Sequence, residues 1–305
     1  MTTQYSTVIV FGPTGDVGSI AALEASKRGA KVWLAMRDPS KNIDGITKVQ
    51  EQQGSFHRIQ ADLTNAESVK SAVQQSGAKA AYLYRVNGME DSIQAMKDAG
   101  IEYVVFLSTS VILPSQDIRQ IPQSDVIAYL HAKIEIALEN ASIAHTALRP
   151  AFFAGNVLRD LDRSKWPWEA RVVHAHWPSD CIAPRDIGRV AGSVLVDRPS
   201  STSKEIIYLA GPQLITSIEQ WNIIKKVTGQ TIEIVQLGPE EYTQELVSKG
   251  FAPPIVKDLV RYKGEVEIES FYPEQFYKEW VANTKKYSGY ESTTFEEYIR
   301  ARGLA

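Results

Sequence analysis

Short apolar runs alternate with helical segments along the first half of the chain, and this alternation constrains the fold more than any other feature. Runs rich in β-branched and aromatic residues lie at Thr7–Phe11, Lys31–Met36, His57–Ala61, Ala80–Tyr84, Tyr103–Leu107 and Ala144–Leu148. Helix-like segments lie at Asp16–Arg28, Ala66–Gln75, Met89–Ala99 and Asp125–Asn140. Strands that alternate with helices form right-handed crossovers in a parallel sheet. The sequence therefore predicts an α/β fold with a doubly wound parallel sheet of the Rossmann type.

The alternation stops after Arg149 and Pro150, where a stretch with two prolines and three tryptophans shows no clear period. Residues 182–212 then resemble one more helix and strand, and Thr216 with Glu219 forms a capping box that predicts another helix start. We predict that residues 1–150, rejoined by about 182–212, form a nucleotide-binding domain. Residues 151–181 and 213–305 would form a smaller, discontinuous α/β substrate-binding region, in which residues 251–260 are expected to be a turn or covering segment.

The composition excludes several classes of protein. The chain has 305 residues, a net charge of −3 and one cysteine, Cys181. This charge provides no basic field for nucleic acid or an anionic membrane, and no apolar run approaches the ~20 residues of a membrane span. A single cysteine forms no intrachain disulfide, and the N-terminus lacks the features of a signal peptide. We expect a cytoplasmic protein, and its oligomeric state stays open.

Three glycines, Gly12, Gly15 and Gly18, follow the first predicted strand and precede the first predicted helix. Glycines let the backbone approach a pyrophosphate closely, and the N–H groups at a helix start attract the anion. A turn that needs glycine for packing alone is the alternative. The context of strand, helix and second strand favours dinucleotide binding.

Arg37 ends the second predicted strand, where an enzyme that uses NAD usually carries an acidic residue for the ribose diol. A guanidinium suits a 2′-phosphate, and Lys41 is near enough in sequence to join it, so NADP(H) is favoured over NAD(H). The neighbouring Asp38 keeps NAD(H) open. Asp62 and Leu63 end the third strand, where a carboxylate can meet the adenine edge.

Ser108 and Ser110 follow the fifth predicted strand, at the sheet edge where ligands of open α/β sheets bind. Tyr129 and Lys133 are four residues apart on the next predicted helix and therefore share a face. An ammonium lowers the pKa of a nearby phenol, so Tyr129 could give a proton to a carbonyl that accepts hydride while a serine holds its oxygen. An amphipathic helix that carries both residues without a role is the alternative. His131 is expected at the helix surface or the edge of the core.

Five aromatic residues fall in or beside the irregular stretch, namely Phe152, Phe153, Trp166, Trp168 and Trp177. They could line a cavity for a flat apolar small molecule, and a small hydrophobic core is the competing interpretation. His174 and His176 share a strand-like face, but no clear third ligand stands nearby, so no metal site is predicted.

Segments along the whole chain resemble an atypical short-chain dehydrogenase/reductase of the NmrA-like group. The segments are FGPTGDVGS, AMRDPSK, ADLTNAESV, YVVFLSTS, YLHAKIEIALENASIAHTALRPAFFAGN and RDIGRVAGSVL. Residues 216–246 resemble the C-terminal region of that group, so the resemblance covers nearly the whole sequence.

The resemblance implies contacts for the cofactor. The phosphate-binding pattern of the group corresponds to Gly12, Thr14, Gly15, Asp16 and Val17, its 2′-phosphate contacts to Arg37 and Lys41, and its adenine contact to Asp62. The end of the fourth strand adds Tyr84 and Arg85, and the phrase HTALRPAFFAGN implies Pro150, Ala151 and Phe152 as neighbours of the nicotinamide ring. By position, Ser110 corresponds to the catalytic serine of the extended short-chain enzymes, with Ser108 as the second candidate.

The group contains NADPH-dependent reductases and also dinucleotide-sensing regulators without turnover, and many members keep the lysine but lack the tyrosine. This chain keeps both Tyr129 and Lys133. We therefore expect an NADPH-dependent reductase of a carbonyl or related unsaturated group on a small aromatic molecule. A non-catalytic NADP(H) sensor with a protein partner is one alternative, and an isomerase or lyase that uses the same tyrosine–lysine pair is another.

Overall fold

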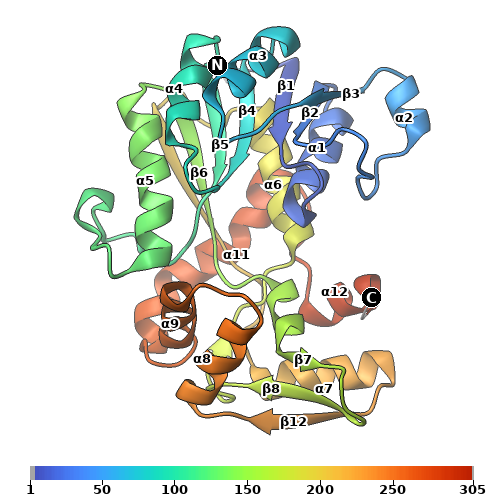
Figure 1. Ribbon diagram of the computed structural model, residues 1–305, viewed down its shortest axis with the longest axis vertical. Helices are drawn as coiled ribbons and strands as arrows, with labels where there is room; N and C mark the ends of the chain where they lie inside the picture. Colours follow the sequence, from blue (N-terminus) through green and yellow to red (C-terminus); the bar gives the residue numbers. More distant parts are fainter. Residues whose placement is uncertain (1–3, 304–305) are drawn as a thin grey trace.

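A seven-stranded parallel sheet forms the upper part of the computed structural model, which describes residues 4–303 (Figure 1). The strands are β1 (Thr7–Phe11), β2 (Lys31–Met36), β3 (Phe56–Gln60), β4 (Ala80–Tyr84), β5 (Tyr103–Leu107), β6 (Ala144–Pro150) and β10 (Lys204–Leu209). Their order is β10-β6-β5-β4-β1-β2-β3. The strand order therefore reverses between β1 and β4, because β2 and β3 follow on one side of β1 and the later strands on the other. This is the predicted Rossmann arrangement, and ligands of such sheets bind at the reversal point.

Helices cover both faces of this sheet, and the central strands β1, β4 and β5 are almost entirely apolar or aromatic, as strands buried on both faces should be. On one face, α1 (Asp16–Lys27) and α6 (Pro184–Val196) pack over Val8 and Val10 of β1. On the other, α3 (Ala66–Ser76), α4 (Glu90–Asp98) and α5 (Val126–Asn140) pack over Ile9 and Phe11. A short helix, α2 (Lys48–Gln52), was not predicted.

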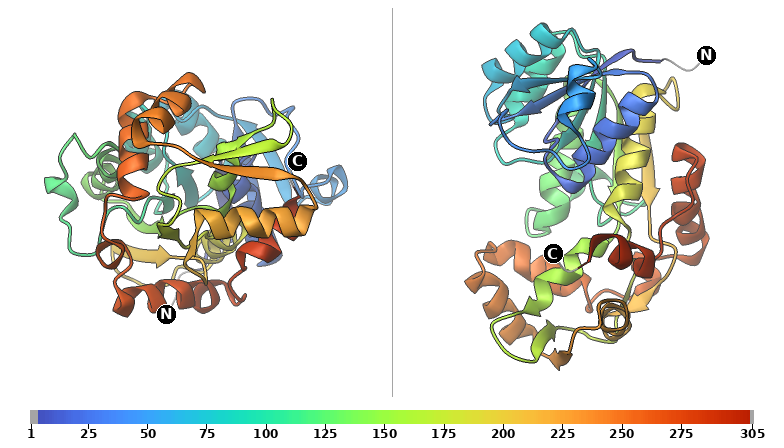
Figure 2. Two further views of the ribbon diagram at one scale, coloured as in Figure 1. Left: turned by 90° about the horizontal axis from the view of Figure 1, so that it is seen from below. Right: turned by 90° about the vertical axis from the view of Figure 1, so that its right-hand side faces the viewer.

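The smaller part of the molecule lies below the sheet in Figure 1 and is seen from two further sides in Figure 2. Its own sheet has the order β12-β8-β7, and β11 pairs with β9. The remaining elements of the chain are η1 (Ile118–Gln120), η2 (Ala154–Asp160), β7 (Leu161–Asp162), β8 (Trp168–Val172), β9 (Pro178–Ser179), β11 (Ile215–Thr216), α7 (Ser217–Thr228), β12 (Ile232–Gln236), α8 (Pro239–Ser248), α9 (Pro253–Tyr262), α10 (Ile268–Phe271), α11 (Glu274–Ser288) and α12 (Phe295–Arg302). Of these, η1 packs on α5, and α11 packs on α6 and β10 of the large part. The chain enters this part after β6, and β10 returns it to the large sheet.

Two local predictions have different outcomes. The capping box is present at the start of α7, where the Thr216 hydroxyl accepts from the Glu219 N–H and the Glu219 carboxylate accepts from the Thr216 N–H. Residues 251–260 were expected to be a turn or covering segment, and this was wrong about their conformation, because Pro253 to Tyr262 form α9. Prolines fit the first helical turn, where a missing N–H removes no hydrogen bond.

Among the residues described, no helix is long and apolar enough to span a lipid bilayer.

Helices α1 and α6 approach each other closely because α6 carries glycine at two contact positions. A Cβ atom at Gly188 would lie 2.5 Å from the Ile20 Cβ, and one at Gly192 would lie 2.5 Å from the carbonyl oxygen of Ala21. Since α1 begins at the glycine-rich loop, this contact fixes the loop relative to the sheet.

We expect Gly192→Ala to lower the free energy of unfolding by about 1–3 kcal/mol, because the added methyl group meets backbone atoms that cannot move aside. Gly238→Ala is the matched control, since no heavy atom lies within 4 Å of a Cβ at this position. This control should change stability by less than about 1 kcal/mol. Urea unfolding monitored by circular dichroism gives both values, and equal changes in the two variants would contradict the packing argument.

Candidate functional site

Two neighbouring cavities lie at the carboxyl edge of the large sheet. The Arg37 cavity has a volume of about 650 Å³ and is lined mainly from the ends of β1, β2, β3 and β4 by residues that include Gly12, Thr14, Arg37, Lys41, Asp62 and Leu63. The Ser110 cavity has a volume of about 360 Å³ and is lined by residues that include Ser108, Ser110, His131, Pro150, Ala151, Phe152 and Phe153. Tyr84, the last residue of β4, and Arg85, which follows it, line both cavities.

The glycine-rich loop forms the base of the Arg37 cavity. Gly12 has a φ of +70°, a conformation that favours glycine, and its N–H donates to the carbonyl of Ala35 at 3.1 Å. A Cβ at Gly18 would lie 2.3 Å from the Gly12 carbonyl oxygen, and one at Gly12 would lie 2.4 Å from the Tyr84 ring. Close packing alone therefore explains part of the glycine pattern. The loop also lines the cavity through Gly12 and Thr14, directly before the N-terminus of α1.

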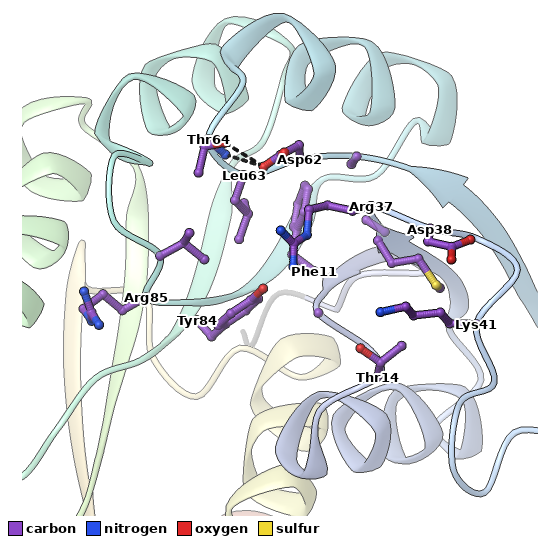
Figure 3. Close-up of a pocket in the computed structure, with 15 residues that line it drawn as sticks. Phe11, Thr14, Arg37, Asp38, Lys41, Asp62, Leu63, Thr64, Tyr84 and Arg85 are labelled. Atoms are coloured by element: carbon purple, nitrogen blue, oxygen red, sulfur yellow. Dashed lines mark hydrogen bonds between the residues drawn. The ribbon is translucent and has the colours of Figure 1, made fainter. Parts of the chain in front are cut away.

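Cationic side chains converge in this cavity. Figure 3 shows Arg37, Lys41 and Tyr84 directing their polar ends toward its centre, with the Thr14 hydroxyl nearby. Neither Arg37 nor Lys41 forms an ion pair within 4.0 Å of a described carboxylate. Asp38 instead accepts from the backbone and hydroxyl of Ser40, and these hydrogen bonds hold the pKa of its carboxyl below the usual range.

Asp62 is also engaged within its own loop. Its carboxylate accepts from the Thr64 N–H at 2.9 Å and from the Thr64 hydroxyl at 2.8 Å, as the dashed lines in Figure 3 show. These hydrogen bonds lower the pKa of Asp62, and the charge of Arg37 adds to the effect. The carboxylate therefore stays ionised at the wall of the cavity, with Leu63 beside it.

The two candidate serines have different environments, although both line the Ser110 cavity. The Ser108 hydroxyl donates to Glu135 at 2.7 Å, and Glu135 forms a buried ion pair with Arg149 at 2.7 Å. Burial raises the pKa of Glu135, but the ion pair with Arg149 outweighs it and holds the carboxyl ionised. The Ser110 Oγ is buried and has no hydrogen-bond partner among the described residues. Ser110 is thus the serine whose hydroxyl has no partner among the described residues, and it belongs to the lining of the Ser110 cavity.

Tyr129 and Lys133 do not line either cavity, which differs from the predicted arrangement. The Tyr129 hydroxyl accepts from the Gln123 amide at 3.3 Å in an exposed position, and Lys133 pairs with Glu90 at 2.5 Å. Tyr129 and Lys133 share a face of α5, as expected. In an ideal helix, Ile127 is rotated by about 200° about the helix axis from Tyr129, so these two side chains point in nearly opposite directions. The Ser110 cavity is therefore lined by the two predicted serines without the predicted tyrosine and lysine.

His131 lines the Ser110 cavity, where Tyr129 was expected, whereas the sequence predicted His131 at the helix surface or the edge of the core. Its Nδ1 lies 2.8 Å from the carbonyl of Ile127, which can only accept, so Nδ1 carries the proton. Burial lowers the pKa of His131 to about 4, and the ring is neutral at pH 7. This leaves Nε2 as an acceptor without a hydrogen-bond partner in the described chain. The sequence signal for this placement was the four-residue spacing of Ile127 and His131, which puts both side chains on one face of the helix.

The five candidate aromatic residues separate into two groups. Phe152 and Phe153 line the Ser110 cavity. Trp177 packs against Phe152 with ring centroids 5.6 Å apart, and Trp168 packs in the core of the smaller part, so both tryptophans support the core interpretation. Trp166 is 74% exposed and contributes to neither. In the described chain, no group of three histidine, cysteine or acidic residues could hold a metal ion.

The outer wall of the Ser110 cavity comes from late in the chain, namely from Leu259, Tyr262 and Phe271. Two contacts hold this wall against the start of α5. Asp258 accepts from the N–H of Ile127 at 2.8 Å, and Asp125 accepts from the Tyr262 hydroxyl. No sequence signal links these positions, because they are brought together only by tertiary packing.

Pro150, Ala151 and Phe152 lie at the end of β6, where a buried carboxylate holds the backbone. Asp180 accepts from the N–H of Phe152 at 2.9 Å, from the N–H of Gly211 at 2.8 Å and from the Tyr272 hydroxyl at 2.7 Å. This single side chain joins three separate segments behind the Ser110 cavity.

Gly15, Asp16 and Val17 lie at the N-terminus of α1, as the resemblance implied. Asp16 pairs with Arg302 of α12 at 3.3 Å in a largely exposed position, and Val17 is buried against the sheet. The loop therefore presents the N–H groups at this end of the helix rather than these side chains.

Comparisons with known proteins agree with this architecture. The NADPH-dependent quinone oxidoreductase of Escherichia coli has a crystal structure with a TM-score of 0.69 and 19% identity, over 97% of this chain and 98% of that one. This likeness shows the same fold.

Sequence comparisons give closer relatives. The nitrogen metabolite regulation-like protein bik4 of Gibberella fujikuroi is 38% identical over 97% of this chain and 96% of its own length. The (4-alkanoyl-5-oxo-2,5-dihydrofuran-3-yl)methyl phosphate reductase of Streptomyces griseus is 24% identical over 83% of this chain and 85% of its own. The model of the NmrA-like family matches residues 4–299. The chain belongs to the NmrA-like family.

Proposed function

We propose that the protein is an NADPH-dependent reductase whose cofactor extends from the Arg37 cavity to the Ser110 cavity. The observation that carries this proposal is the joining of the two cavities at Tyr84 and Arg85, with two unpaired cations at one end and an unpaired buried hydroxyl at the other. The E. coli protein is named as an NADPH-dependent quinone oxidoreductase and the S. griseus protein as a reductase, which supports the same class of reaction.

The residues present fit NADP(H). Arg37 and Lys41 provide charge for a 2′-phosphate and have no carboxylate partner to displace, while Asp38 is engaged by Ser40. The backbone at Gly12 and Gly15 and the start of α1 suit the pyrophosphate. Residues Pro150 to Phe152 would lie beside the nicotinamide, which supplies a hydride when bound.

Around the reacting carbonyl, we assign the roles from the free polar atoms. The Ser110 hydroxyl donates a hydrogen bond to the carbonyl oxygen and stabilises the negative charge that develops there. The neutral His131 accepts a hydrogen bond at Nε2 and so orients a hydroxyl of the substrate or a water molecule. That hydroxyl or water supplies the proton that the carbonyl oxygen takes up after hydride transfer. Phe152, Ile127 and Leu259 provide the apolar wall for a flat ring. Tyr129 has no part in this mechanism, which departs from the expectation drawn from its spacing to Lys133.

A second candidate function is an NADP(H)-sensing regulator. The observation in its favour is that the relative with 38% identity, bik4, is named as regulation-like, together with the absence of Tyr129 and Lys133 from the cavity linings. A sensor would keep the cofactor contacts and bind a protein partner. It would bind NADPH without turnover of any carbonyl compound, whereas an isomerase or lyase would turn over its substrate without consuming NADPH.

Arg37→Met should raise the Kd for NADPH by about tenfold or more and change the Kd for NADH by less than about threefold, because only NADPH carries the 2′-phosphate. Titration of the cofactor by fluorescence measures both values. Arg300→Met is the control, since Arg300 lies on the exposed face of α12 and pairs with Glu296. Equal weakening of both cofactors by Arg37→Met would contradict the assignment of the 2′-phosphate site.

Ser110→Ala should lower kcat by about 10²–10³-fold with an unchanged Kd for NADPH, because it removes the donor to the developing oxyanion. The assay follows NADPH oxidation with a panel of aromatic ketones, aldehydes and quinones. Tyr129→Phe should keep kcat within about twofold of wild type, because its hydroxyl points to Gln123.

A large loss in Tyr129→Phe, with Ser110→Ala near wild type, would instead restore the mechanism predicted from the tyrosine–lysine spacing. Tight NADPH binding with no turnover across the panel would favour the sensor.

A further inference from the structure

Arg85 is a cation without a counter-ion at the junction of the two cavities. Its guanidinium is partly buried, and burial lowers its pKa from the usual value. The one hydrogen bond to a described side chain goes to the neutral amide of Asn87. No carboxylate of residues 4–303 lies within ion-pair distance of Arg85. A guanidinium that is partly withdrawn from water and has no counter-ion favours the binding of an anion beside it.

The nearest acidic group does not meet this requirement. Glu90 exerts an electrostatic effect on Arg85, but its carboxylate is already paired with Lys133 at 2.5 Å. These three side chains together carry one net positive charge. His131, which also lines the Ser110 cavity, adds no negative charge because its ring is neutral.

The direction of the Arg85 side chain separates it from the phosphate contacts. In Figure 3 its guanidinium points away from the centre of the Arg37 cavity, on the opposite side of Tyr84 from Arg37 and Lys41. Arg85 also lines the Ser110 cavity, where the remaining lining is apolar or neutral, from Ser110 and His131 to Phe152. The positive charge therefore belongs to the cavity that would hold the substrate.

We propose that Arg85 binds an anionic substituent of the substrate, and that the substrate is an aromatic carbonyl compound with a carboxylate or a group of similar charge. The guanidinium would donate two parallel hydrogen bonds to the anion, and the aromatic ring of the substrate would lie against Phe152 and Leu259. This proposal rests on the proposed function in taking the Ser110 cavity as the substrate site. It changes the role that the family resemblance implied for Arg85, from cofactor to substrate contact.

The test compares two probes that cannot be reduced, 2-naphthoate and 2-naphthamide, which have the same ring and differ in charge. Calorimetry measures their binding to the NADPH-loaded protein, because the positive ring of NADP⁺ would attract the carboxylate by itself. Wild type should bind the acid about tenfold or more tightly than the amide. Arg85→Met should raise the Kd of the acid by about 10–100-fold and leave that of the amide within about twofold. Arg85→Lys should recover part of the preference, and Arg300→Met should retain all of it.

Each outcome has a separate meaning. Equal affinity of wild type for both probes, or loss of both probes in Arg85→Met, would overturn the proposal. A tenfold loss of NADPH affinity in Arg85→Met with an unchanged acid-to-amide ratio would assign Arg85 to the cofactor instead. If acid selectivity is present but no carbonyl compound is turned over, the reductase function fails while the anion site stands. A melting temperature near that of wild type establishes that each variant is folded.

Discussion

The buried ion pair between Arg149 and Glu135 holds the candidate site in place. Both side chains are at most 2% exposed, and two charges so far from water persist only when their hydrogen bonds are complete. Arg149 also donates to the carbonyl of Ile112 and to the hydroxyl of Tyr208, and Glu135 accepts from Ser108. The pair thus connects β6, α5, β10 and the loop after β5. Removing either charge would leave the other unpaired, which costs about 3–5 kcal/mol in comparable buried pairs.

This pair also explains why the face of α5 could not be predicted from the sequence. Tyr129 with Lys133 and Ile127 with His131 have the same four-residue spacing, so either could face a ligand. The rotation of the helix is decided by Glu135, which must reach Arg149 on a strand fourteen residues later.

The large sheet, by contrast, was predictable from local information. Strands β1, β2, β4 and β5 have the predicted bounds because each is a short apolar run between turn residues. The cations of the Arg37 cavity were predictable for the same reason, since Arg37 follows β2 directly and Lys41 is four residues further on. The wall made by Leu259, Tyr262 and Phe271 was not, because its contact with the start of α5 exists only in the folded chain.

Membership of the NmrA-like family leaves two functional classes open, and turnover of NADPH is what distinguishes them. The buried Ser110 hydroxyl has no hydrogen-bond partner among the described residues. Leaving such a group without a partner costs about 1–3 kcal/mol. Ser110 and Arg85 line the same cavity, and the Arg85 guanidinium has no counter-ion in the described chain. Their arrangement is what the proposed reductase and its anionic substrate would use.

The two cavities draw on different lengths of chain. The Arg37 cavity is lined by residues 11–86, all from the first strands and their loops, whereas the Ser110 cavity is lined by residues 84–271. Substitutions in α9 and α10 can therefore reshape the outer wall of one cavity without touching the other. A lineage with this architecture can change the shape of the Ser110 cavity through substitutions in α9 and α10 while the Arg37 cavity is inherited unchanged.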